Sequence, residues 1–341
     1  FQRTSMNFST PYDDWVGHDA TAHQAPTRFQ TLMMWLTVLL PFIGLAIGFA
    51  WLFHQPAGLV DFFTCILMYA IAGFGITVGY HRMATHRAFT GHPIVRAFWM
   101  IAGSTGFQGP IISWVAVHRR HHQRSDMEGD PHSPHANEHG STLAGLWHAH
   151  TAWLIRPEPA NLRRSVKDLA ADPLTRFVDR TYLLWVILGA LIPFAIGWLA
   201  KGTIGGAFAT LVWGFFVRLA VMQHATWSVN SICHTFGYRS YRASDESRNN
   251  PLVAFFSLGE GWHNNHHAFP TSARHGIAWY EIDFSWIVIW WMRTLRIVRE
   301  VRVPTESDLA LRRRTSSEAG EAETAEAKPR AFRCSRRACS R

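Results

Sequence analysis

The stretch TLMMWLTVLLPFIGLAIGFAWLFHQPAGLVDFFTCILMYAIAGFGITVGY, residues 31–80, decides the fold. It contains two apolar segments, residues 31–53 and 57–80, each longer than the about 20 residues that a helix needs to cross a bilayer. Only the tripeptide HQP separates them. The sequence therefore predicts two membrane-crossing helices joined in a tight hairpin.

A second pair of apolar segments follows about a hundred residues later. Residues 181–200 and 203–224 are again long enough to cross the bilayer, with a short link around Lys201 and Gly202. We therefore expect an all-α integral membrane protein with four transmembrane helices in two hairpins.

The composition supports a membrane protein and argues against a nucleic-acid partner. Of 341 residues, 48% are hydrophobic and only 17% are charged, below the roughly 25% usual in soluble proteins. The net charge is +9, and the basic residues responsible lie between and after the apolar segments. The topology of a membrane protein places basic residues there without any nucleic-acid partner.

Charge also predicts the orientation. Residues 81–180 are rich in arginine and lysine, whereas the two hairpin links carry only Lys201. The positive-inside rule then places the 81–180 segment and both termini in the cytoplasm. The expected location is a bacterial cell membrane.

The remaining segments complete the predicted organisation. Residues 1–30 form a polar N-terminal segment, and residues 31–303 form the membrane domain. Within that domain, residues 93–117 are interpreted as an interfacial or half-buried helix, and the Trp-rich residues 284–299 as a helix lying at the interface or in the core. Residues 304–341 are polar and repetitive, and are predicted to be a disordered tail.

Histidines are concentrated in four short motifs on the predicted cytoplasmic side. They are HRMATH (81–86), HRRHH (118–122), NSICH (230–234) and HNNHH (263–267). On a helix, positions i, i+3 and i+4 share a face, so the histidines of each H-x-x-H-H motif are expected to point to one place. Isolated histidines, such as His54 and His275, are interpreted as surface or interface residues.

These motifs indicate a metal centre, because neutral imidazole is the commonest metal ligand and burying many rings without partners is costly. The candidate ligands are His81, His86, His118, His121, His122, His234, His263, His266 and His267. They exceed what one ion needs, so two metals are expected. Structural zinc sites usually use cysteine ligands, whereas soluble di-iron proteins use a pair of Glu-x-x-His motifs. This sequence contains neither a cysteine–histidine zinc pattern nor a pair of Glu-x-x-His motifs. Iron that activates O₂ fits best.

The motifs, in this order between paired crossings, resemble the three histidine boxes of integral-membrane acyl-CoA desaturases of the stearoyl-CoA, delta-9 type. The resemblance extends to DPHSPH, NSICHTFGYRSY and GEGWHNNHHAFP, and covers about residues 30–300. It implies a cytoplasmic helical cap that carries a di-iron site bound by the nine histidines. Asn230 matches the family asparagine that reaches one metal through a water.

The resemblance also implies a kinked tunnel for the acyl chain, with Gln108, Trp114 and Thr226 at its bend. Animal enzymes have an Arg–Asp pair that helps to hold coenzyme A, and this chain has Ala116 and Val117 there. Acyl-CoA is still the expected substrate, with a chain on a phospholipid or a carrier protein as alternatives. Candidate acids that orient the histidines are Asp130, Glu260 and Asp283.

The resemblance implies O₂-dependent insertion of a cis double bond, at the delta-9 position, into a long-chain acyl thioester. The sequence has no dinucleotide fingerprint and no haem-binding segment, so a ferredoxin, reductase or cytochrome is expected to supply electrons. A membrane di-iron alkane or fatty-acid hydroxylase is the first alternative. A membrane metal transporter is the second, but it would need ligands near the bilayer midplane.

Overall fold

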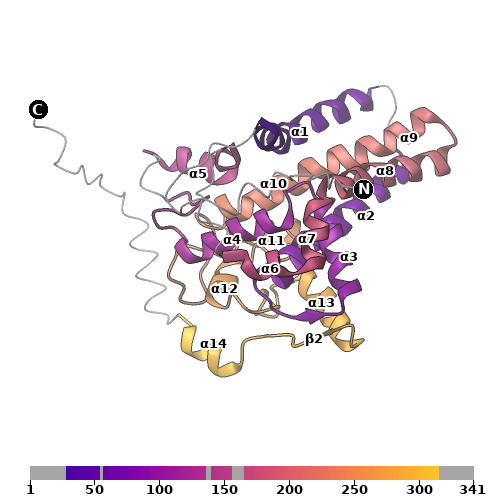
Figure 1. The fold of residues 1–341 in the computed structure, drawn as a ribbon. Coiled ribbons are helices and arrows are strands. Elements are labelled where there is room, and N and C mark those ends of the chain that lie inside the picture. Colours follow the sequence, from indigo (N-terminus) through magenta and orange to yellow (C-terminus); the bar gives the residue numbers. More distant parts are fainter. Residues whose placement is uncertain (1–27, 54–56, 136–139, 156–164, 315–341) are drawn as a thin grey trace, which may run out of the picture.

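The computed structural model is mostly helical and describes residues 28–53, 57–135, 140–155 and 165–314 (Figure 1). The predicted all-α class is confirmed. Most of the polar N-terminal segment and the HQP link, including His54, lie outside the described residues.

In the described part of the chain, four helices are long and apolar enough to cross a membrane, as predicted. The first hairpin consists of α1 (Arg28–Leu52) and α2 (Leu59–Phe74), which the π-helix η2 (Gly75–Thr85) continues. The second consists of α8 (Tyr182–Lys201) and of α9 (Ile204–Leu211), which η5 (Val212–Val217) and α10 (Arg218–Ser231) continue.

Two crossings extend further than their apolar segments predicted. The second crossing reaches Thr85 rather than residue 80, and the fourth reaches Ser231 rather than residue 224. Their polar ends are buried by the shorter helices, where backbone groups need hydrogen-bond partners, so the helical ladder continues. As a result, His81 and Asn230 lie within helices.

The shorter elements gather at one end of α10 and form what we call the cap (Figure 1). Its elements are α3 (Pro93–Ser104), α4 (Ile111–Arg124), α5 (Thr142–His150), η3 (Ala152–Ile155), α6 (Lys167–Ala171), α7 (Pro173–Arg180), α11 (Pro251–Phe256), α12 (His263–Ala268), α13 (Phe284–Thr294) and α14 (Glu306–Arg312). Strands β1 (Thr90–Gly91) and β2 (Val298–Arg299) pair antiparallel across it.

Glycines let α3 lie directly against η2. A Cβ added to Gly75 would lie 2.0 Å from the backbone nitrogen of Gly103, and one added to Gly79 would lie 2.6 Å from the carbonyl oxygen of Trp99. Small residues permit this close backbone approach between helices in a membrane. The contact fixes the end of the second crossing, which carries the first histidine motif.

A buried ion pair ties the two hairpins together at the end away from the cap. Asp61 of α2 is 1% exposed and accepts hydrogen bonds from Lys201 Nζ at 2.5 Å and Thr210 Oγ1 at 2.7 Å. The one cation of the hairpin links is thus neutralised by a carboxylate of the opposite hairpin.

The two segments predicted as single interfacial or half-buried helices are each divided into two elements in the structure. Residues 93–117 fall into α3 and α4, which a turn at 105–110 separates, and neither is among the candidate crossings. In the 284–299 segment, helix α13 ends at Thr294, because Arg296 adopts φ +58° and residues 298–299 form β2. One face of α13 is exposed and aromatic.

The segment after Pro304 was expected to be disordered, and this is wrong for its first part. Helix α14 begins with a capping box between Thr305 and Asp308. Leu309 packs with Phe269, and Arg312 donates to the carbonyl oxygen of Ala268 at 2.6 Å. Residues 315–341 lie outside the described residues.

Candidate metal centre

The structure brings the predicted histidines together in two buried groups. Within each group, the candidate ligand atoms all lie within 4.8 Å of one another. The larger group, which we call the five-histidine group, is His81, His86, His118, His122 and His266. The other, the four-histidine group, is His121, His234, His263 and His267.

The π-helix explains how His81 and His86 meet. A π-helix bonds residue i to i+5, and the His86 N–H donates to the His81 carbonyl oxygen at 3.1 Å. The two Nε2 atoms are then 3.1 Å apart. An α-helical period would not align two residues that are five apart.

The prediction that the histidines of each H-x-x-H-H motif point to one place is wrong. Each motif supplies histidines to both groups. In α4, His118 and His122 enter the five-histidine group and His121 enters the other. In α12 the division is reversed: His266 alone joins the five-histidine group. At about 100° per residue, positions i and i+4 are about 40° apart, whereas i+3 lies about 60° to the other side.

Carboxylates hold the outer Nδ1 atoms of four of these rings. His81 Nδ1 lies 2.5 Å from Glu260, and His121 Nδ1 lies 3.0 Å from Asp130. The other two contacts join His234 to Asp126 at 2.8 Å and His267 to Asp245 at 2.6 Å. A proton held at Nδ1 leaves the Nε2 lone pair directed inward, which is the form a metal ligand needs.

Sequence reasoning found two of these acids and missed the others. Asp130 and Glu260 contact histidines, as expected. Asp283 does not contact a ligand ring but pairs with Arg82 at 2.9 Å, and Arg82 in turn donates to Glu260. Asp126 and Asp245 could not be found from spacing, because the folded chain brings Asp126 to His234 across 108 sequence positions.

His275 was also missed. It is fully buried, its Nδ1 lies 3.4 Å from Glu260, and its ring centroid lies 4.4 Å from that of His266. The interpretation of this isolated histidine as a surface or interface residue was therefore wrong. No local repeat marks it in the sequence.

The donor set fits metal ions. The Nε2 atoms of His121 and His267 are buried and have no hydrogen-bond partner in the described part of the chain. Other inward Nε2 atoms face only one another, as His81 and His266 do at 3.1 Å. Buried lone pairs of this kind are costly, and a metal ion would satisfy them together.

The pKa values of five of the rings agree with this chemistry. Burial, followed by neighbouring imidazoles, lowers the pKa of His86, His118, His122, His263 and His266 well below the usual value, which favours neutral rings. For His234, burial lowers the pKa, but the neighbouring carboxylates, Asp126 foremost, together have the greater effect and the net shift is upward. For Asp126, Asp130 and Asp245, burial alone would raise the pKa, but the paired histidines outweigh it and the net shift is downward.

The other predicted site residues occupy two places. Asn230 lies in the last turn of α10, four residues before His234, and its contact with a metal through water stays a prediction. Gln108, Trp114 and Thr226 form a hydrogen-bonded chain: Gln108 Nε2 donates to Thr226 Oγ1 at 2.9 Å, and Trp114 Nε1 donates to Gln108 Oε1 at 3.3 Å. Trp114 stacks on His118, so this chain adjoins the five-histidine group.

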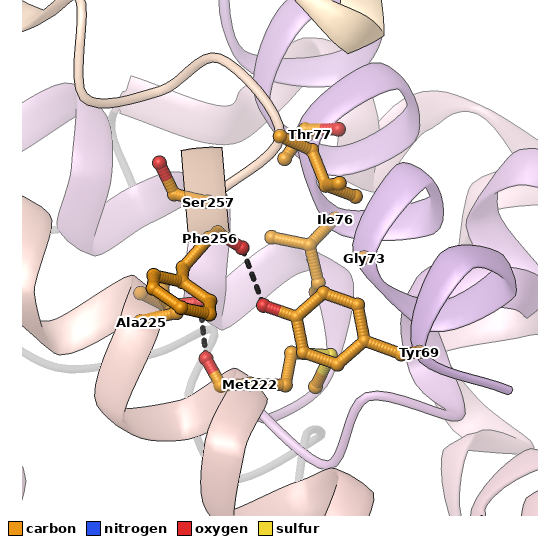
Figure 2. A pocket seen from close by; sticks show the side chains of 10 residues that line it. Tyr69, Gly73, Ile76, Thr77, Met222, Ala225, Phe256 and Ser257 are labelled. Carbon is orange, nitrogen blue, oxygen red and sulfur yellow. Dashed lines mark hydrogen bonds between the residues drawn. The ribbon is translucent and has the colours of Figure 1, made fainter. Parts of the chain in front are cut away.

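Thr226 also lines an apolar pocket between α2, η2, α10 and α11 (Figure 2). The pocket is narrow and partly open, with a cavity volume of about 10 Å³. Tyr69 closes one side, where its hydroxyl donates to the carbonyl oxygen of Phe256 (Figure 2). Gly73 and Ile76 lie along the same wall, toward His81.

Comparison with known proteins identifies the family. The model of the fatty acid desaturase family matches residues 57–288, more than half of the chain. The chain belongs to the fatty acid desaturase family. It is therefore a membrane oxidoreductase, and its histidine groups are the metal-binding feature of a desaturase.

Characterised desaturase relatives differ in their acyl carrier. The chain is 41% identical to a hex-5-enoyl-[acyl-carrier protein] acetylenase of Moorena producens, over 81% of this chain and 87% of that protein. It is 37% identical to an sn-1 stearoyl-lipid 9-desaturase of Anabaena variabilis, over 79% and 94%. It is also 37% identical to an acyl-CoA C20 Delta5-desaturase of Anemone leveillei, over 72% and 75%.

We predict that Asp126→Asn weakens metal retention, because His234 loses the carboxylate that fixes its tautomer. Loss of such a partner typically lowers metal affinity about 10- to 100-fold. The measurement is metal content per chain after challenge with graded chelator. Glu128→Gln, an exposed change on the same loop, is the matched control and should behave as wild type. Equal retention by both variants would contradict the assigned role of Asp126.

Proposed function

We propose that this desaturase inserts a cis double bond, at the delta-9 position, into a long-chain fatty acyl-CoA at a centre of two iron ions. The observation that carries the proposal is the pair of adjacent all-histidine groups, which lie beside the hydrogen-bonded chain of Gln108, Trp114 and Thr226.

The five-histidine group would hold one iron, and the four-histidine group, with Asn230 through a water, would hold the other. Iron in these sites would supply the O₂-dependent oxidation that an unactivated alkyl C–H bond requires, since no side-chain acid or base can break such a bond. The reaction removes two hydrogens from adjacent carbons and leaves an alkene. O₂, two electrons and two protons from outside the chain complete the balance, and two water molecules form.

The pocket in Figure 2 would receive the methyl end of the acyl chain. Its lining is mainly apolar, and it extends along α2 from the level of Thr77, close to His81, to Tyr69, further from the cap. Gln108 and Thr226 would mark the bend between this end and the carbons beside the metals. Each buried methylene would contribute about 0.8 kcal/mol to holding the chain in register.

This chain would bind coenzyme A through other residues than the animal enzymes do. Ala116 and Val117 are buried in α4, so neither position offers a charged contact. Arg120 and Arg124 lie further along the same helix, and Arg124 is exposed. We propose that arginines at this end of α4 attract the anionic headgroup in place of the missing pair.

The cap would face the cytoplasm of a bacterial cell, in agreement with the positive-inside pattern. A separate ferredoxin, reductase or cytochrome would deliver the electrons there. The basic residues of the cap suit an acidic partner.

The proposal predicts new unsaturated fatty acids when the chain is expressed in a desaturase-deficient host with a ferredoxin and its reductase. Wild type should yield a cis delta-9 alkene by gas chromatography and mass spectrometry, and His266→Ala should yield none, because it removes a ligand-forming ring. Purified enzyme given stearoyl-CoA, stearoyl-carrier protein or stearoyl-lipid should act on the thioester of coenzyme A. A hydroxylated product would support the hydroxylase instead, and activity on the lipid alone would overturn the assigned carrier.

A second prediction concerns chain length. Gly73→Leu should fill the pocket, because a Cβ at this position already lies 2.7 Å from Leu258 Cδ1. If two methylenes lose their burial, the preference for an 18-carbon over a 16-carbon chain should fall about 15-fold in kcat/KM. Leu67→Phe adds volume on the exposed side of the same helix and should leave the ratio unchanged. An unchanged ratio in Gly73→Leu would show that the acyl chain does not reach this pocket.

A further inference from the structure

The turn that carries Gln108 adopts an unfavourable conformation. It joins α3 to α4 across residues 105–110, and within it Phe107 has φ +55° and Gly109 has φ +100°. Glycine tolerates such angles, but a residue with a bulky side chain rarely adopts them. The surroundings of the turn must therefore hold Phe107 in place.

Two side chains of α10 bind three successive carbonyl groups of this turn. Arg218 Nη1 donates to the Thr105 oxygen at 3.0 Å. Gln223 Nε2 donates to the Phe107 oxygen at 2.8 Å and to the Gly106 oxygen at 3.5 Å.

Tyr182 of α8 holds the other side of the turn. Its hydroxyl oxygen accepts from the Gly109 N–H at 3.1 Å, and its ring stacks parallel to that of Phe107. Side chains from both helices of the second hairpin thus fix the backbone on either side of Gln108.

Arg218 and Gln223 are unusual residues for this location. Both are fully buried within the fourth crossing, where an arginine is costly. Arg218 Nη2 and Gln223 Oε1 are buried without a hydrogen-bond partner in the described structure. Burying these two polar side chains costs free energy, which indicates that the backbone geometry they hold in the turn matters to the site.

The same helix also carries the partner of Gln108. Thr226 lies one turn beyond Gln223 on α10 and accepts from Gln108 Nε2. We infer that Arg218, Gln223 and Tyr182 are positioning residues that determine the position of the double bond by fixing Gln108 against Thr226. This inference rests on the proposed function, in which Gln108 and Thr226 form the bend of the acyl channel.

The test compares Gln223→Leu with Tyr182→Phe and with Thr210→Val as the matched control. Thr210 is a fully buried polar residue of the same crossing, but it bonds Asp61 at the far end. Double-bond positions are determined by mass spectrometry of derivatised products. Because a displacement of about 1 Å can change rates about 100-fold, we expect displaced isomers to rise about tenfold in Gln223→Leu and less in Tyr182→Phe. Thr210→Val should lower yield without changing the position.

Hydrogen–deuterium exchange gives a readout that does not depend on turnover. The peptide spanning residues 105–110 should exchange faster in Gln223→Leu and Tyr182→Phe than in wild type or Thr210→Val. If the Gln223→Leu protein does not accumulate in the cells, both measurements are made on Tyr182→Phe alone. That variant keeps the ring that stacks on Phe107 and loses only the hydroxyl group. Unchanged isomers in the variants, with an active wild type, would overturn the positioning role and leave the proposed function standing. A wild type that forms no double bond would instead overturn the proposed function.

Discussion

The contact between a carboxylate and the outer nitrogen of an imidazole is the interaction on which the site depends. Asp130, Asp126 and Asp245 each lie against the Nδ1 atom of one ring, and Glu260 lies against those of His81 and His275. Each contact fixes a tautomer, and each leaves a lone pair directed inward. Without these acids, the rings could rotate or carry their proton on the inward nitrogen, and the lone pairs would no longer converge on one place.

Those contacts require the fold to bring distant segments together. The HRMATH motif lies at the end of a membrane crossing, HRRHH lies on α4, and HNNHH lies on α12. The last two each supply histidines to both groups. The reciprocal division between α4 and α12 places the two groups side by side. The second crossing, which carries His81, and the fourth, which carries Asn230, also supply most of the lining of the apolar pocket.

The sequence predicted the crossings and the histidines, because both depend on local patterns: the length of an apolar run and the spacing of one residue type. It did not predict the π-helix, since the helical period of residues 75–85 depends on packing against α3 through Gly75 and Gly79. Contacts across long sequence distances, such as Asp126 with His234 or His275 with Glu260, leave no local pattern at all. Helix α14 was missed because its composition resembles the polar sequence after it, although Thr305 and Asp308 form a local capping box. Tertiary contacts such as that of Leu309 stabilise it further.

The most direct test of the central claim is iron analysis combined with X-ray absorption and Mössbauer spectroscopy on protein purified from iron-supplied cells. The account predicts about two irons per chain, each in a shell of nitrogen and oxygen atoms dominated by imidazole. A single iron per chain, or sulfur in the first coordination shell, would contradict it.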